Sequence, residues 1–398
     1  MAVIPLAEPR RKLAASPSGC AVLALGFRPF YLLAAVLAVL LVPVWILLLT
    51  GVIALAPGVS PLLWHGHEMI FGFTAAIIVG FLFTAGRNWT GLQTPTGAPL
   101  AALVVLWLAG RVAPFVLPAA AAALVDLAFL PVAAMVLGRV LIRAGSRRNY
   151  FILALLIVLG LANLFSHAGA QGWFAVSPLL GLHLAIAVIA TLCTAIAGRI
   201  VPSFTANALK TVPWQRMRID QLAIGGTLVS LVLWAFDGPA GVLVPFTTAT
   251  AVLQAVRCNG WRPWATLHTP LLWILHLSHG WLIVALLMLA AAGMGLVPAS
   301  AVVHVLTVGL IAGLILGMIT RTTLGHTGRL LRAGSIETAC YLLLQAALAL
   351  RVLPQFFMPT AYLPGLQVSA ALWALCFALY LLKYAPMLWR PRVDGQEG

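Results

Sequence analysis

The sequence predicts an all-α protein that crosses a membrane many times. Of its 398 residues, 63% are hydrophobic and only 8% are charged, which leaves too little polar surface for a water-soluble fold of this size. The hydrophobic residues gather in runs of about 20, the length of helix that crosses a bilayer. Polar and apolar residues do not alternate along these runs, so membrane β-strands are excluded.

Taken in order, the apolar runs predict about twelve helices in a single transmembrane domain, residues 1–398. The first run follows a basic segment and could be mistaken for a secretory signal, but Arg28 interrupts it and the run continues to Leu49, which indicates an uncleaved helix. The predicted helices are 29–49, 64–85, 98–117, 119–141, 149–167, 178–198, 219–236, 239–257, 267–290, 299–319, 335–353 and 363–386.

The formal net charge of +15 is spread over short clusters between these runs. Such clusters orient a membrane protein, and they do not form a nucleic-acid surface. Nearly all Lys and Arg residues lie on one side, beginning with Arg10, Arg11 and Lys12 and ending with Arg390 and Arg392. Because basic loops stay in the cytoplasm, we expect both termini to be cytoplasmic.

Two arginines, Arg111 and Arg351, break this rule, and both stand in the same R-V-x-P phrase at the end of a predicted helix. The recurrence favours three pseudo-equivalent four-helix units, 20–148, 149–264 and 265–390. The alternative is that apolar sequences resemble one another by composition alone.

Seven of the nine histidines are expected in the outer half of the bilayer or at its midplane, and the second helix of each unit carries at least one. They are His65, His67, His167, His183, His276, His279 and His304. Neutral imidazole is a common ligand of haem iron and copper. A hydrogen bond to a neighbouring helix explains any single histidine equally well, but the set as a whole favours a metal site. His65 and His67 cannot both face inward on a regular helix.

The five cysteines form no C-x-x-C or C-x-x-C-H motif, so any haem would be held by histidine without a covalent bond. A lone guanidinium in the membrane is costly unless it is paired. Arg111 could pair with Asp126 at a similar depth, or Arg111 and Arg351 could both bind haem propionates. Glu68 is a candidate proton relay. Arg321 and His326 form a candidate cytoplasmic site, for which simple loop structure is the favoured interpretation.

Six short sequence motifs, which follow one another along most of the chain, show a resemblance to a known family. They are Phe27-Arg28-Pro29-Phe30, Trp64-His65-Gly66-His67-Glu68-Met69, Asn88-Trp89-Thr90-Gly91, Gly198-Arg199-Ile200-Val201-Pro202-Ser203-Phe204-Thr205, His304-Val305-Leu306-Thr307-Val308-Gly309 and the stretch 321–329. In these phrases the chain resembles the NnrS family, bacterial membrane proteins that contain haem and copper and belong to the response to nitric oxide.

The resemblance implies haem and copper as cofactors and the bacterial inner membrane as location. We therefore expect haem to be bound by a set of three histidines and two arginines: His65, His67, His304, Arg111 and Arg351. Copper or a second haem is expected at His183, His276 and His279.

The predicted architecture also resembles the catalytic subunits of haem-copper oxidases and nitric oxide reductases, which carry histidines on helices 2, 6 and 10. The predicted helix 219–236 has no histidine, however, and helix 299–319 has one instead of a pair. A copy of that binuclear centre is therefore not expected, although His276 and His279 could supply a different one.

These observations favour a protein that binds or reduces nitric oxide at a histidine-ligated site, with quinol or another electron donor as partner. An oxidoreductase activity is favoured but not decided by the sequence. The alternative is a transporter of a small solute or metal ion, in which Glu68 and the histidines relay protons. A non-catalytic sensor or metal-delivery protein would show the same sequence features.

Overall fold

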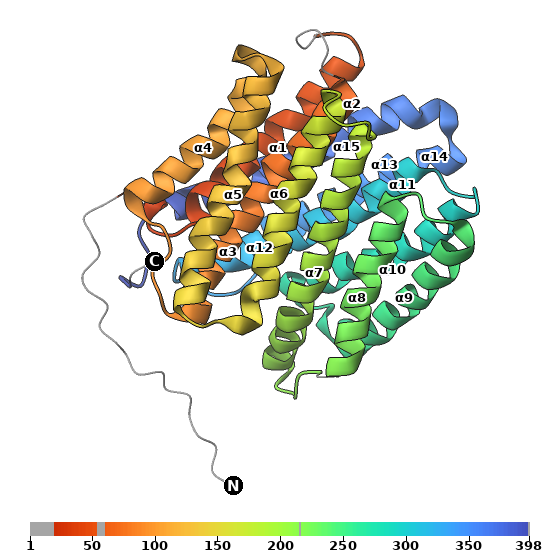
Figure 1. The fold of residues 1–398 in the computed structure, drawn as a ribbon. Helices are drawn as coiled ribbons and strands as arrows, with labels where there is room; N and C mark the ends of the chain where they lie inside the picture. Colours follow the sequence, from red (N-terminus) through yellow and green to blue (C-terminus); the bar gives the residue numbers. More distant parts are fainter. Residues whose placement is uncertain (1–19, 54–59, 215, 397–398) are drawn as a thin grey trace.

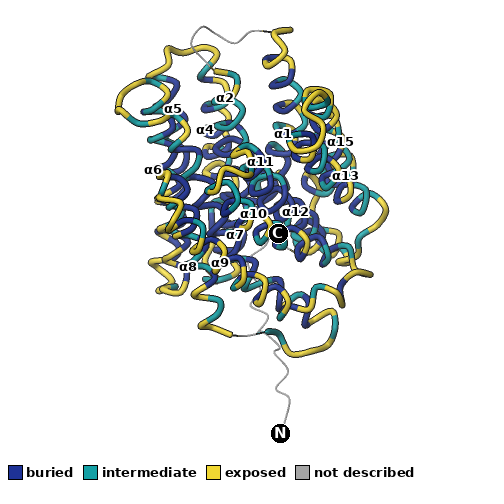
Figure 2. The backbone as a smooth tube through the Cα atoms, turned by 90° about the vertical axis from the view of Figure 1, so that its right-hand side faces the viewer, coloured by how far each residue is buried: buried dark blue, intermediate teal, exposed yellow. Residues whose placement is uncertain are grey.

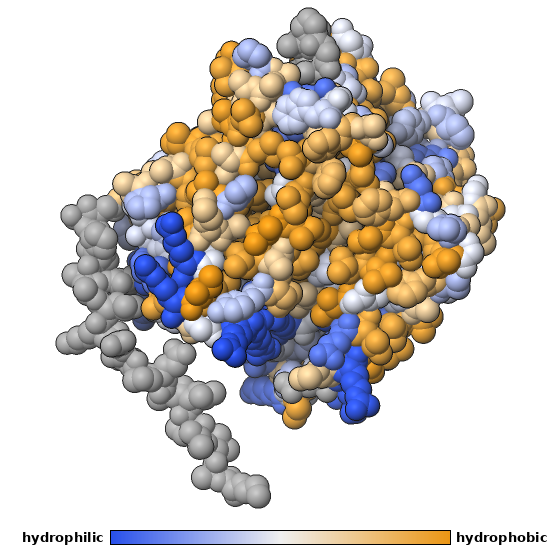
Figure 3. All heavy atoms as spheres, in the orientation of Figure 1, coloured by the Kyte–Doolittle hydropathy of each residue, from blue (hydrophilic) through white to orange (hydrophobic). Residues whose placement is uncertain are grey.

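The computed structural model describes residues 20–53, 60–214 and 216–396 (Figure 1). Within these ranges the chain is helical and contains no strand, and twelve helices are long and apolar enough to cross a membrane. This confirms the predicted all-α polytopic fold and a multi-pass membrane protein. Figure 3 shows hydrophobic side chains over most of the visible face and hydrophilic ones gathered near its lower edge.

The first six spans are α1 (Phe27–Leu49), α2 (Pro61–His67) continued by α3 (Ala75–Thr90), α4 (Gly97–Val116), α5 (Ala119–Arg143), α6 (Tyr150–Ala170) and α7 (Pro178–Leu209). The remaining spans are α8 (Met217–Ala235), α9 (Ala240–Gly260), α10 (Pro270–Gly293), α11 (Ala299–His304) continued by α12 (Gly313–His326), α13 (Ser335–Val352) followed by α14 (Pro354–Phe357), and α15 (Tyr362–Trp389).

Most predicted ends agree with these bounds to within a few residues, but α7 runs eleven residues past its predicted end at 198. The helix continues beyond the apolar run because its backbone hydrogen bonds form within the helix and do not depend on apolar side chains; the Ser203 hydroxyl also donates to the Arg199 carbonyl. It ends at Lys210, which adopts a left-handed conformation with φ of 52°.

Two spans contain π-helical turns that the sequence did not predict. Glu68–Thr74 connects α2 to α3, and Val305–Ala312 connects α11 to α12. Each begins directly after a histidine, His67 or His304. Because a π-turn adds a residue to the helical repeat, it changes the direction in which neighbouring side chains point, and such turns are frequent at functional sites.

The second, sixth and tenth spans, each of which carries a histidine, form the centre of the bundle. In their most apolar stretches, 89% of the residues are buried in the span Pro61–Thr90, 67% in α7 and 72% in the span Ala299–His326, against 22% in α8. Figure 2 shows the same contrast between a buried centre and an exposed rim. The histidines of the second, sixth and tenth spans therefore lie on helices whose side chains can meet away from lipid.

Candidate functional site

A cavity of about 330 Å³ lies among the second, sixth and tenth spans. It is lined by His65, His183 and His304, one from each span, and by Arg351 of α13. We call it the histidine cavity. Most of its other lining residues are apolar, and its volume falls in the range of roughly 300–1,000 Å³ that is typical of small-molecule sites.

His304 is oriented by the helix turn that precedes it. Its Nδ1 lies 2.7 Å from the carbonyl oxygen of Ser300. Since a carbonyl only accepts hydrogen bonds, Nδ1 carries the proton and Nε2 keeps its lone pair. Histidines that bind metals are commonly held in this way. His304 is therefore prepared to act as a ligand.

The other two imidazoles of the cavity are held by aromatic rings. His65 stacks on Trp45, with ring centroids 4.1 Å apart, and His183 lies 4.3 Å from the ring of Trp234. The Nδ1 atom of His65 is buried and has no hydrogen-bond partner among the described residues. A buried polar atom without a partner costs free energy.

Arg351 is 8% exposed. Only part of the hydrogen-bonding capacity of its guanidinium is used. Its Nη2 donates to the Ser300 hydroxyl at 3.1 Å, while Nε and Nη1 are buried with no hydrogen-bond partner in the described part of the chain. The guanidinium also faces the ring of Tyr362 at 5.5 Å. No carboxylate of the described residues forms an ion pair with it. A buried cation in this state attracts an anion.

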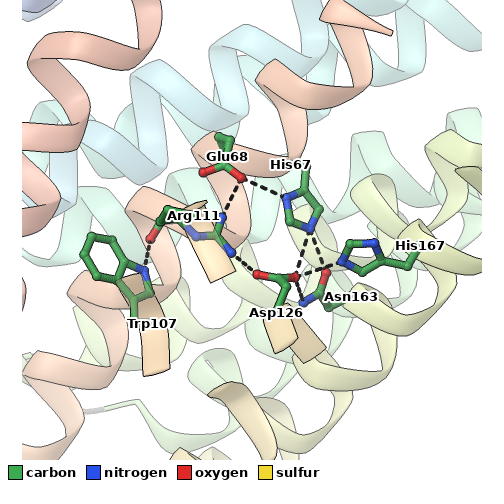
Figure 4. Close-up of polar contacts among 8 residues, drawn as sticks. His67, Glu68, Trp107, Arg111, Asp126, Asn163 and His167 are labelled. Carbon is green, nitrogen blue, oxygen red and sulfur yellow. Dashed lines mark hydrogen bonds and ion pairs between the residues drawn. The ribbon is translucent and has the colours of Figure 1, made fainter. Parts of the chain in front are cut away.

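Arg111 lies in different surroundings (Figure 4). It donates to Glu68 at 2.7 Å and forms an ion pair with Asp126. Asp126 also accepts hydrogen bonds from Asn163 at 2.8 Å and from His167 at 2.9 Å. We call the group the Arg111 cluster; its members are His67, Glu68, Arg111, Asp126, Asn163 and His167. Of the two alternatives, the structure shows the pairing with Asp126, and Arg111 does not line the histidine cavity.

His65 and His67 point to different sites, as two positions of one regular turn must. His65 lines the cavity, whereas His67 lies 3.3 Å from a Glu68 oxygen and 3.0 Å from the Asn163 oxygen. The expected haem set is thus divided: His65, His304 and Arg351 share the cavity, and His67 and Arg111 belong to the cluster. Glu68 has its carboxylate engaged by Arg111 and His67.

His276 and His279 form a third polar group. Their Nε2 atoms contact the Thr205 hydroxyl at 2.9 Å and the Gln254 oxygen at 3.2 Å, and both rings face Trp261. Neither lines the histidine cavity, so the structure does not bring this pair together with His183.

Arg321 and His326 lie in packing contacts near the end of α12. The Arg321 guanidinium lies 3.9 Å from the centroid of the Phe204 ring, and the His326 ring lies 5.6 Å from that of Phe27. The His326 carbonyl accepts a hydrogen bond from Arg392. These contacts explain both side chains without a ligand.

Sequence reasoning missed Ser300, Asn163 and His167 as partners. Ser300 lies four residues before His304, one helical turn away, and Asn163 lies four residues before His167. Polar side chains at that spacing in an apolar helix share a face, which is the signal that could have found them.

A comparison with known protein families finds a match over nearly the whole chain. A family model described as NnrS protein matches residues 21–392. The chain belongs to the NnrS family. The match spans both the histidine cavity and the Arg111 cluster, and NnrS membership suggests a membrane protein of the nitric oxide response. No curated protein matches the chain.

Proposed function

We propose that this NnrS-family protein binds a non-covalent haem in the histidine cavity and uses it to bind or reduce nitric oxide. One observation carries the proposal: Ser300 positions both an imidazole and a guanidinium in the same cavity. Its carbonyl accepts from His304, and its hydroxyl accepts from Arg351. An imidazole with a free Nε2 suits haem iron, and a guanidinium with unpaired N–H groups suits a propionate.

The proposed role of each residue follows from its nitrogen atoms that have no partner among the described residues. His304 would hold the iron, and His65 offers a second imidazole whose Nδ1 lacks a partner. Arg351 would hold a propionate through its guanidinium, two nitrogen atoms of which have no hydrogen-bond partner among the described residues. When bound, the haem would supply an iron centre that binds nitric oxide and exchanges electrons.

The apolar lining serves the ligand as well as the haem. Side chains such as Ile70, Phe73 and Ile311 line the same cavity. They exclude water and favour a small uncharged molecule that partitions into lipid. This property supports nitric oxide as the ligand over a charged solute.

Copper is the second proposed cofactor, and the family resemblance is its main support. Of the three residues expected to bind it, His183 lines the cavity and could face a metal beside the haem. His276 and His279 each keep a buried Nδ1 without a hydrogen-bond partner among the described residues.

We also propose the bacterial inner membrane and cytoplasmic termini, because the basic residues follow the even-numbered spans and precede α1. The histidine cavity then lies toward the outer half of the membrane, since α2 and α11 enter from that side. A membrane-soluble quinol or another donor would supply electrons for reduction.

The test is an optical spectrum with iron and copper analysis of the purified protein, followed by titration with nitric oxide under anaerobic conditions. We expect a Soret band that shifts with nitric oxide and is lost in His304→Ala. His326→Ala is the matched control and should keep it. Purified protein without iron or a Soret band would overturn the proposal, and solute uptake by haem-free protein in liposomes would favour the transporter.

A further inference from the structure

The Arg111 cluster contains a group of side chains that the haem proposal does not use. Three potential metal donors, the His67 and His167 imidazoles and the Asp126 carboxylate, lie within 4.8 Å of one another. Oδ2 of Asp126 is 3.2 Å from His67 Nε2 and 2.9 Å from His167 Nε2. Donors at about 2.0–2.2 Å from one ion are separated by roughly 3–3.5 Å. We propose that these three side chains bind a first-row transition-metal ion.

The hydrogen bonds around His67 reveal a missing positive charge. Its Nδ1 faces a Glu68 oxygen at 3.3 Å, and because a carboxylate accepts, Nδ1 carries the proton. The Nε2 lone pair of the neutral ring then faces two further acceptors, Asn163 Oδ1 at 3.0 Å and Asp126 Oδ2 at 3.2 Å. Asn163 cannot be turned round, since its Nδ2 donates to Asp126. Three acceptors therefore converge on one gap, which requires a cation.

The charges of the cluster lead to the same conclusion. Glu68 and Asp126 contribute two negative charges and Arg111 one positive charge, so one negative charge remains when both imidazoles are neutral. The side chains of Glu68 and Asp126 are only 4% and 5% exposed. An uncompensated negative charge at that depth is costly. A monovalent ion such as Cu⁺ would neutralise it, and a divalent ion would leave the cluster with one positive charge.

The surroundings of the three donors favour a metal over a proton. Two imidazoles and a carboxylate are a donor set that first-row transition metals accept. His167 would bind through Nε2 in the tautomer that carries its proton on Nδ1, so the metal would replace the hydrogen bond from Nε2 to Asp126. Two of the three donors are also oriented from behind: Glu68 holds His67, and Arg111 and Asn163 hold the two oxygens of Asp126. Such supporting hydrogen bonds are typical of metal sites. The His67 and His167 side chains remain 15% and 16% exposed, which leaves an access route for the ion.

This site is separate from the haem proposal. None of its three donors lines the histidine cavity, and α2 presents His65 to one site and His67 to the other. Loss of one cofactor should therefore leave the other in place.

The experiment measures metals by mass spectrometry in three forms of the full-length protein: wild type, His167→Ala and the control His326→Ala. Each is measured as purified and again after EDTA dialysis and reloading with Zn²⁺ or Cu²⁺ in separate samples. We expect about one ion per chain, beyond haem iron and the separately proposed copper, in the wild type and in His326→Ala. In His167→Ala we expect at least a tenfold weaker retention of the reloaded ion, with the Soret absorbance unchanged.

If His167→Ala does not fold, His167→Gln replaces it, because glutamine keeps a donor for Asp126 and removes the imidazole. Equal metal retention in the wild type and the His167 variants would overturn the proposal, as would a wild type that holds no ion after reloading. In the second case a proton on His67 fills the gap. Haem absorbance in the same samples reports on the proposed function independently, so a haem-free protein that binds the ion would contradict only the haem.

Discussion

Arg111 and Arg351 carry the same R-V-x-P phrase, yet they lie in opposite surroundings. Arg111 pairs with Glu68 and Asp126 in a cluster that satisfies its charge. Arg351 keeps two buried nitrogen atoms without partners and faces the histidine cavity. The phrase thus fixes a position at a helix end, while residues on neighbouring helices decide whether that position stabilises the fold or binds a ligand. The three-unit repeat itself stays a prediction.

The largest effect is expected from Asp126→Asn. Arg111 would remain paired with Glu68, but the asparagine amide would present an N–H₂ group to the donors that the Asp126 carboxylate accepts from. Each lost hydrogen bond to a charged group costs about 1.5–3 kcal/mol. We expect a low yield of folded protein and a strongly lowered midpoint of thermal unfolding in detergent. Asp394→Asn is the matched control, because Asp394 pairs with Arg392 at the surface, where ion pairs contribute about 0–1 kcal/mol. Equal stability of the two variants would remove the contrast between the arginines.

Arg351→Leu should behave in the opposite way. The substitution removes a buried charge that has no acidic partner among the described residues, so the protein should fold with an unchanged or raised unfolding midpoint. Haem retention should fall several-fold, because the proposed propionate partner is lost. Arg351→Lys should restore part of it. Full haem occupancy in Arg351→Leu would show that this side chain does not bind propionate.

An intermediate effect is expected from Gly72→Ala beside the Arg111 cluster. A Cβ atom there would lie 2.9 Å from a Glu68 oxygen and 3.0 Å from an Arg111 nitrogen, so the pair must shift. We expect a loss of roughly 1–3 kcal/mol, the usual cost of overpacking, with unchanged haem content. Gly225→Ala, where no atom lies within 4 Å, should be neutral or stabilising. Stability that is equal in both variants would show that the cluster is loosely packed.

The smallest effect is expected from His276→Ala. Its ring bonds Thr205, and it does not line the histidine cavity. The haem-to-protein ratio should match that of the wild type, although the lost hydrogen bond costs about 0.5–1.5 kcal/mol. A fall in haem content would connect this third polar group to the cavity.

Much of the fold could be predicted, because twelve apolar runs of spanning length leave few alternatives. The grouping of His65, His183 and His304 was also accessible, since three helices that run in one direction carry histidines near their starts. The sequence could predict only in part that His65 and His67 belong to different sites. Helical geometry requires that they diverge, but which one faces the cavity depends on the packing of α2 against α1 and α7.

The remaining features depend on contacts between distant segments. The π-turns after His67 and His304 have no local sequence signal that we recognise. The pairing of Arg111 with both Glu68 and Asp126 joins three different helices, and a sequence shows only depth in the membrane. The site of His67, Asp126 and His167 was missed for the same reason, because its donors come from three different spans.

The central claim is that the histidine cavity binds haem and the Arg111 cluster does not. The most direct test is the haem-to-protein ratio of His304→Ala and His67→Ala, purified in parallel with the wild type and measured from Soret absorbance and iron content. The account predicts that His304→Ala loses most of its haem and that His67→Ala keeps it. Haem lost from His67→Ala but retained in His304→Ala would contradict the assignment.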